Sequence, residues 1–160
     1  MILDVINFHA GLARVLDLLR SPLLLFTRVW VSWQFLKSGW LKLSDWDSTL
    51  ELFRSEYQVP LLPPTLAATL GTAGELLFPT LLILGLLTRI GALGLFGVNL
   101  LAVVSYWHVL GQEGFEAALA QHVLWGFMAL LPCAFGAGGF SLDAVLERRR
   151  PMVSRQPAAN

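Results

Sequence analysis

The chain has 160 residues, of which 56% are hydrophobic and only 14% are charged, and its formal net charge is zero. So few charged residues cannot cover the surface of a water-soluble domain of this size, and no basic patch points to nucleic acid. The single cysteine, Cys133, excludes an internal disulfide and a cage of thiolate ligands within one chain. The composition therefore predicts an integral membrane protein, with no metal site and no covalently bound cofactor.

The first segment of the chain has apolar residues at helical spacing. Val5, Phe8, Leu12 and Leu19 fall on one side, with polar residues on the other. This pattern predicts an amphipathic helix over residues 1–21 that lies along the membrane surface and ends near Pro22. No basic residue precedes the first apolar stretch, so we expect the segment to be retained rather than cleaved as a signal peptide.

Four later segments have the length of about 20 residues that is needed to cross a bilayer. They are residues 23–43, 65–87, 90–110 and 118–138. None alternates like the strand of a membrane barrel, so the predicted fold is an all-α, four-helix membrane bundle forming a single domain over residues 1–150. After the last span, we expect a short surface helix over residues 141–149, capped by Ser141, and then a flexible tail over residues 151–160.

The distribution of arginines predicts the orientation in the membrane. Arg14 and Arg20 precede the first span, Arg89 lies in the turn between the second and third, and Arg148 and Arg149 follow the fourth. The other two connections carry mainly acidic residues. Since basic residues concentrate on the cytoplasmic side, we expect both termini to be cytoplasmic.

The polar residues inside the predicted spans include Arg28, Lys37, Glu75 and Asn99. An ion at the centre of a membrane helix costs about 2.5–3.5 kcal/mol on insertion scales, so each is expected to be paired, hydrated or neutral. Arg28 shares a helical stripe with Gly39, which allows another helix to approach closely. We therefore expect Arg28 to pair with Glu75, while Lys37 faces an outer cavity.

Two interpretations of this intramembrane polar cluster remain open. It either holds the helices in register, or forms a pocket that binds a small ligand or moves a proton. Further pocket candidates near the outer surface, which also suit an interfacial aromatic belt, are Trp40, Tyr106, His108, Gln121, His122 and Trp125. A quinone head group would suit His, Gln or Lys beside aromatic walls, whereas a metal would need a third ligand that the sequence does not show.

Three stretches of the sequence resemble DoxX-type membrane proteins. They are FLKSGWLKLSDW (residues 35–46), GTAGELLFPTLLILGLLTRIGAL (residues 71–93) and GAGGFSLD (residues 136–143). The resemblance covers roughly residues 23–146 and implies a four-helix protein of the bacterial inner membrane. It also implies an arginine in the first helix and a glutamate in the second, matched by Arg28 and Glu75, a Gly-x-x-Lys turn from Gly39 to Lys42, and a Leu-Thr-Arg turn at residues 87–89.

Some members of this family resemble the membrane subunit of thiosulfate:quinone oxidoreductases. This implies a subunit that presents a quinone or sulfur-compound pocket, is at most part of an oxidoreductase, and needs a protein partner. YQVPLLPP (residues 57–64) and QHVLWG (residues 121–126) resemble instead a subgroup found with copper-binding modified peptides, which implies a non-catalytic partner or a small-solute passage. A structural scaffold is a third alternative, and Gly91, Gly94 and Gly97 suit packing either within one chain or between copies in a homo-oligomer.

Overall fold

The structure is a computed structural model that describes residues 2–149. Within this range every regular element is a helix. The helices are α1 (Ile2–Ser44), α2 (Trp46–Ser55), α3 (Pro64–Leu84), α4 (Thr88–Ser105), α5 (Trp107–Leu110), α6 (Glu116–Phe135) and α7 (Leu142–Arg149). The predicted tail over residues 151–160 lies outside the described residues.

Three helices of the described chain, α3, α4 and α6, are long and apolar enough to cross a membrane. Large apolar side chains on their surfaces are exposed, as lipid-facing side chains would be; examples are Leu77, Leu93, Val123 and Phe127. Each of these helices begins and ends slightly earlier than the span predicted for it. Helix α4 ends at Ser105 because the backbone of Tyr106 is not helical, and the short helix α5 follows. The chain is therefore a multi-pass protein of a lipid bilayer.

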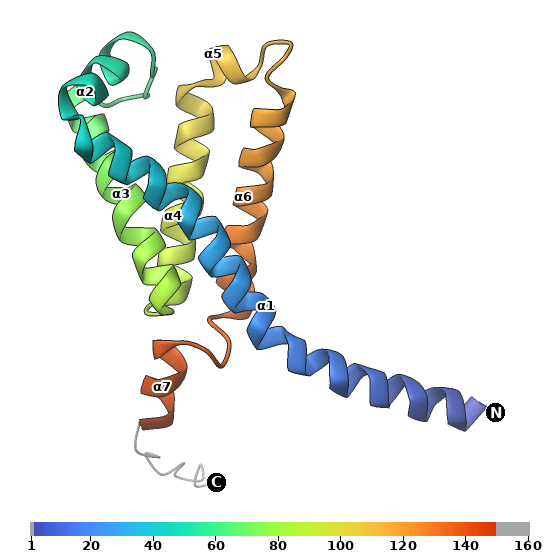
Figure 1. Ribbon diagram of the computed structural model, residues 1–160. Coiled ribbons are helices and arrows are strands. Elements are labelled where there is room, and N and C mark those ends of the chain that lie inside the picture. The colour runs from blue at the N-terminus through green and yellow to red at the C-terminus, as the bar shows by residue number, and fades with distance from the viewer. Residues whose placement is uncertain (1, 150–160) are drawn as a thin grey trace, which may run out of the picture.

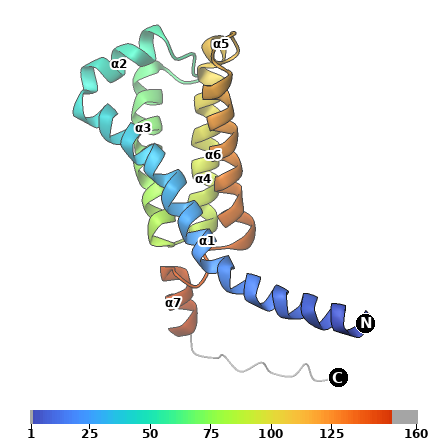
Figure 2. The ribbon, with the colours of Figure 1, turned by 45° about the vertical axis from the view of Figure 1, so that its right-hand side comes forward.

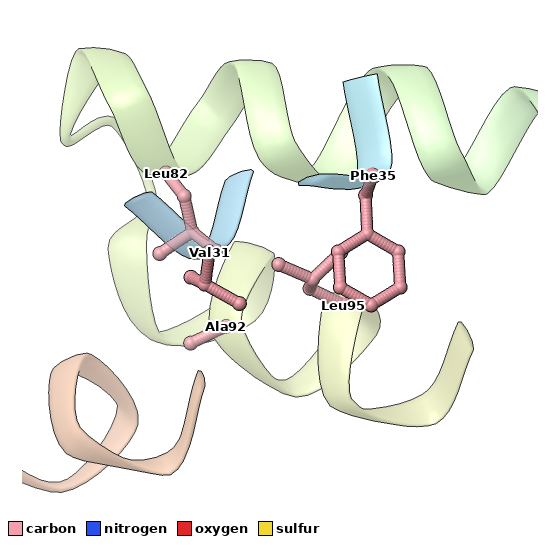
Figure 3. Packing of buried hydrophobic residues seen from close by; sticks show 5 residues of the cluster. All are labelled: Val31, Phe35, Leu82, Ala92 and Leu95. Atoms are coloured by element: carbon pink, nitrogen blue, oxygen red, sulfur yellow. The ribbon is translucent and has the colours of Figure 1, made fainter. Parts of the chain in front are cut away.

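The long helices contact one another in a closed ring. The C-terminal half of α1 packs against α3 and α6, and α4 packs against both of these helices in turn. Figures 1 and 2 show α1 crossing the others obliquely. The buried core contains Val31, Phe35, Leu82, Ala92 and Leu95 (Figure 3). Cys133, which is half-buried, packs against this cluster from α6.

The prediction that the first helix ends near Pro22 is wrong. Helix α1 runs without a break from Ile2 to Ser44, with Pro22 inside it. A proline lacks the amide hydrogen and crowds the carbonyl group four residues earlier, which can bend a helix without ending it. Figure 1 shows the N-terminal part of α1 turning away from the other helices, and apolar side chains on it such as Phe8 and Leu18 are exposed.

One end of the bundle is covered by α2 and the loop that follows it (Figure 1). Asp45 caps α2, since its carboxylate accepts hydrogen bonds from the backbone N–H and the hydroxyl of Ser48. Phe53 then packs on Ala67 of α3. The N–H of Gln58 donates to the carbonyl oxygen of Ser105 at 2.9 Å, which fixes the loop to the end of α4.

The other end is held by a joint between the α3–α4 turn and the start of α7. The Asp143 carboxylate accepts hydrogen bonds from the N–H groups of Leu87 and Thr88, both at 2.9 Å, and the Asp143 N–H donates to the Gly85 carbonyl oxygen at 2.8 Å. Gly85 has a φ of +64°, and a Cβ atom there would lie 2.5 Å from that of Ser141. Ser141 itself caps α7 by accepting from the N–H of Ala144, as predicted.

The joint predicts a pH-dependent contribution to stability from Asp143. Burial by itself would raise the pKa of this carboxyl, but hydrogen bonds from Thr88 and Leu87 and the nearby charge of Arg28 outweigh it and lower the pKa. A carboxyl whose pKa is lowered by folding stabilises the native state above its unfolded-state pKa of about 3.9. That stabilisation is lost as the pH falls through the lower, folded-state pKa.

We therefore expect Asp143→Asn to be less stable than wild type by about 1 kcal/mol at pH 7, and the difference to shrink as the pH falls below about 4. Thermal unfolding in detergent between pH 3 and pH 7 measures both quantities. Glu51→Gln, which removes an exposed carboxylate from α2, is the matched control. A constant difference between Asp143→Asn and wild type over this pH range would contradict the assignment.

Candidate functional site

A cavity of about 560 Å³ lies among α1, α3, α4 and α6, beneath α2 and its following loop. We call it the Glu75 cavity. Its walls are mostly apolar and include Phe35, Phe53, Phe78, Val98 and Trp125. Its polar lining includes Gln34, Ser38, Tyr57, Glu75 and His122. Small-molecule sites have this character, with volumes of about 300–1,000 Å³, apolar walls and few polar groups.

Glu75 on α3 forms an ion pair with Lys42 on α1. Glu75 Oε1 lies 2.5 Å from Lys42 Nζ, which also donates to the Ser38 hydroxyl at 3.2 Å. The two charged side chains are only 9% and 13% exposed. Gly39 allows this approach, because a Cβ atom there would lie 2.9 Å from the Leu76 side chain and 3.1 Å from Glu75 Cβ. Pairing removes most of the penalty that either ion would carry alone in the membrane.

The predicted ion pair between Arg28 and Glu75 is wrong. Arg28 lies 14 residues before Lys42 on α1, which places it roughly 21 Å away along the helix at about 1.5 Å per residue. Both residues belong to the stripe that contains Gly39. The prediction failed because α1 crosses α3 obliquely (Figure 1), and the residues of α1 that contact Glu75 and Leu76 are Lys42 and Gly39, close to its C-terminal end.

Arg28 instead binds the loop between α6 and α7. Its side chain is fully buried, and its guanidinium donates to the carbonyl oxygens of Ala137 and, at 2.8 Å, of Phe140. Arg28 Nη1 also lies 3.1 Å from where a Cβ atom of Gly85 would stand. Arg28 therefore belongs to the Asp143 joint, at the far end of the bundle from the Glu75 cavity.

Asn99 on α4 orients His122 on α6. The Asn99 Nδ2 donates to the backbone carbonyl oxygen of His122 at 2.9 Å, and the Asn99 Oδ1 lies 2.9 Å from His122 Nδ1. A carbonyl oxygen can only accept, so the first contact fixes the direction of the amide and the second makes Nδ1 the protonated ring nitrogen. His122 also packs edge-on against Trp125, with ring centroids 5.0 Å apart.

Two tyrosines stand at the covered end of the cavity. Tyr57 contacts both Phe53 and Tyr106 in edge-to-face geometry, with centroid distances of 4.8 Å and 5.3 Å. Burial raises the pKa of the Tyr57 phenol, and the negative charge of Glu75 raises it further. The phenol therefore stays protonated and can donate or accept a hydrogen bond. The Tyr106 hydroxyl is already engaged, since it donates to Glu56 Oε2 at 3.2 Å.

The structure brings together some of the predicted site residues and separates others. Glu75, Tyr106, His122 and Trp125 line the cavity. Asn99 lies behind His122 and positions it.

The other predicted residues lie elsewhere. Lys37, Trp40, His108 and Gln121 are exposed and are not part of the cavity lining, and Arg28 lies at the opposite end of the bundle. His108 contacts only the edge of the site, through the Tyr106 ring at 5.5 Å.

The sequence prediction missed Lys42 as the partner of Glu75 and Tyr57 as a wall of the cavity. Lys42 was placed at the end of a span, where a cation can reach water and needs no partner. The available signal was its position three residues after Gly39, on the face expected to pack most closely. Tyr57 had no such signal, because only the folded loop after α2 brings it over the cavity.

Comparison with known proteins identifies the family. Residues 23–108 match the DoxX family, which is more than half of the chain. The chain belongs to the DoxX family. The DoxX match includes Lys42, Glu75 and Asn99 and ends at α5, before His122 and Asp143.

The chain is also similar to a protein of Haemophilus influenzae described as uncharacterized. The two are 28% identical over 136 residues, which cover 82% of this DoxX chain and 87% of the other protein. No solved structure matches the chain at a significant level.

Proposed function

We propose that this DoxX protein is a small subunit of a redox complex in the bacterial inner membrane, and that the Glu75 cavity binds a quinone head group. The observation that carries the proposal is a carboxylate, an oriented imidazole and aromatic walls around one cavity of about 560 Å³. The resemblance to the membrane subunit of thiosulfate:quinone oxidoreductases supports the same ligand class. A protein partner would complete the redox activity.

We further propose that the C-terminal half of α1 is a fourth membrane span. Two of its three cations are neutralised or held by polar partners, because Lys42 pairs with Glu75 and Arg28 donates to two carbonyl groups. Only Lys37 remains exposed. The span therefore carries a much smaller insertion penalty in the folded protein than its composition suggests.

Four spans place both termini on the same side of the membrane, and we propose that this is the cytoplasmic side. The basic residues support this orientation, because they gather at the α7 end of the bundle. Arg20 donates to the Phe135 carbonyl oxygen at 3.3 Å, and Arg89 and Arg148 line a shallow hollow beside the Asp143 joint. Concentration of arginines at one end is typical of the cytoplasmic face. The Glu75 cavity then lies toward the periplasmic side.

Filling the cavity from α4 tests the proposal. Gly97 lines the cavity, and a Cβ atom added there meets nothing within 4 Å. Gly97→Leu is therefore expected to fold and to weaken the binding of a short-chain benzoquinone at least about tenfold, since it places a branched side chain in the ligand's space. Titration of the detergent-purified protein by isothermal calorimetry measures the affinity.

Lys37→Met, a substitution at an exposed position of α1 outside the cavity, is the control and should bind like wild type. Thermal unfolding of both variants checks that each is folded. The proposed site would be rejected if Gly97→Leu bound the benzoquinone as tightly as wild type.

A further inference from the structure

The polar atoms that line the Glu75 cavity are mainly hydrogen-bond acceptors. Glu75 itself is buried, and its Oε1 is occupied by Lys42. In the described part of the chain, its Oε2 is buried and has no hydrogen-bond partner. Burying an acceptor of this kind without a partner is costly, especially when it carries charge. This orphan oxygen marks the place where a ligand would donate a hydrogen bond.

His122 supplies a second acceptor. Because Asn99 Oδ1 holds the hydrogen on Nδ1, the neutral imidazole carries its lone pair on Nε2. Its donor nitrogen is therefore already engaged, and only Nε2 remains for a ligand. The backbone contact from Asn99 Nδ2 prevents the amide from flipping to reverse this assignment.

The remaining polar groups can either donate or accept. Gln34 donates one Nε2 hydrogen to the Trp30 carbonyl oxygen of its own helix, and it keeps its other amide hydrogen and its Oε1. Ser38 and Tyr57 carry hydroxyl groups that can rotate to either role. Lys42 is not among the lining residues, and two of its three donor hydrogens are used on Ser38 and Glu75.

We propose that the Glu75 cavity selects an uncharged ring bearing hydroxyl donors, so that it binds a quinol more tightly than the corresponding quinone. This inference rests on the proposed function and names the redox form that the site prefers. A quinol brings two O–H groups that can donate to Glu75 Oε2 and to a second acceptor such as His122 Nε2. A quinone brings only carbonyl oxygens, which leave both acceptors without a partner.

The same set of polar and charged groups disfavours the binding of an anionic sulfur compound in this cavity. Among the residues that the structure describes, no lysine or arginine lines the cavity, and Lys42, which contacts Glu75 from α1, already neutralises it. A sulfur oxyanion would lie against the free carboxylate oxygen within low-dielectric walls, where like charges repel strongly. Of the two ligand classes that the sequence left open, the geometry favours the ring compound.

The test compares three ligands on the detergent-purified protein under anaerobic conditions. They are a short-chain benzoquinone, its two-electron-reduced quinol, and the dimethyl ether of that quinol. The quinol is expected to bind at least about tenfold more tightly than either of the other two, because only it can donate to the carboxylate. In Glu75→Gln the preference should fall to within about threefold, since a neutral amide accepts more weakly. Lys37→Met should keep the wild-type preference.

The outcomes separate the two proposals. Tight binding of the benzoquinone with no preference for the quinol would overturn this inference and leave the proposed function standing. Equal binding of the quinol and its dimethyl ether to the wild-type protein would overturn it without needing any variant. Binding of none of the three ligands would reject the quinone site and this inference with it.

Discussion

Arg28→Ala is expected to destabilise the protein by about 3–5 kcal/mol. The arginine side chain is fully buried, and its removal leaves the carbonyl groups of Ala137 and Phe140 without their donors and a void where the side chain was. It also removes the positive charge beside Asp143. The free energy of unfolding, from chemical denaturation in detergent micelles, measures the loss.

Arg14→Ala is the matched control. Arg14 is exposed and, among the described residues, donates to the Ala10 carbonyl oxygen of its own helix, so this variant should lie within about 0.5 kcal/mol of wild type. Arg28→Lys should recover only part of the loss, because a lysine cannot offer the guanidinium fork to two carbonyl groups at once. Equal stability of Arg28→Ala and Arg14→Ala would show that the buried contacts do not hold α1 to the α6–α7 loop.

Lys42→Met is expected to destabilise the protein by about 3–5 kcal/mol, because it leaves Glu75 as a buried charge without its partner. The double variant Lys42→Met/Glu75→Gln contains no charge at this position and should lie within about 2 kcal/mol of wild type. The double variant is therefore expected to be more stable than Lys42→Met alone. Denaturation of the wild type, both single variants and the double variant forms a complete mutant cycle.

Lys37→Met provides the comparison for this cycle, since it removes an exposed cation from the same helix. It should change stability little. If Lys42→Met unfolded at the same denaturant concentration as Lys37→Met, the ion pair would contribute nothing to the fold. If the double variant were stable but no longer bound a ligand, Glu75 would serve the cavity as well as the packing of α1 on α3.

The helical fold could be predicted because it depends on local patterns. Long apolar runs bounded by glycine, proline and arginine identify α3, α4 and α6 within a few residues. The serine cap of α7 is also a local signal. Pro22 misled the prediction, since a proline signals a break although a helix with enough neighbouring hydrogen bonds can pass through it with a bend.

The contacts of the charged residues could not be predicted in the same way. Counting residues from the end of each span gives the depth of a side chain only if the helices stand upright and parallel. The oblique path of α1 breaks this assumption and moves Lys42, rather than Arg28, to the level of Glu75. Arg28 binds backbone carbonyl groups, which every residue carries and which therefore leave no mark in the sequence.

The contact between Asn99 and His122 could also not be predicted, although both residues could be identified as candidates. Both residues stand out in the sequence as polar groups on apolar helices. Their contact depends on how α4 and α6 are rotated about their own axes. Both helices are apolar on nearly every face, so the sequence does not show which face of one helix meets the other. Candidate site residues could therefore be identified from the sequence. Which of them line the cavity, which support a lining residue and which lie far from it could not be predicted.

The Asp143 joint has a consequence for how DoxX proteins diverge. Arg28, Gly85 and Asp143 come from three stretches that are far apart in the chain, yet their atoms meet at one point. Energetic effects of residues in direct contact are not additive, so a lineage that loses one of the three has little reason to keep the others. We expect these positions to covary among relatives, being retained together or replaced together, independently of residues around the Glu75 cavity.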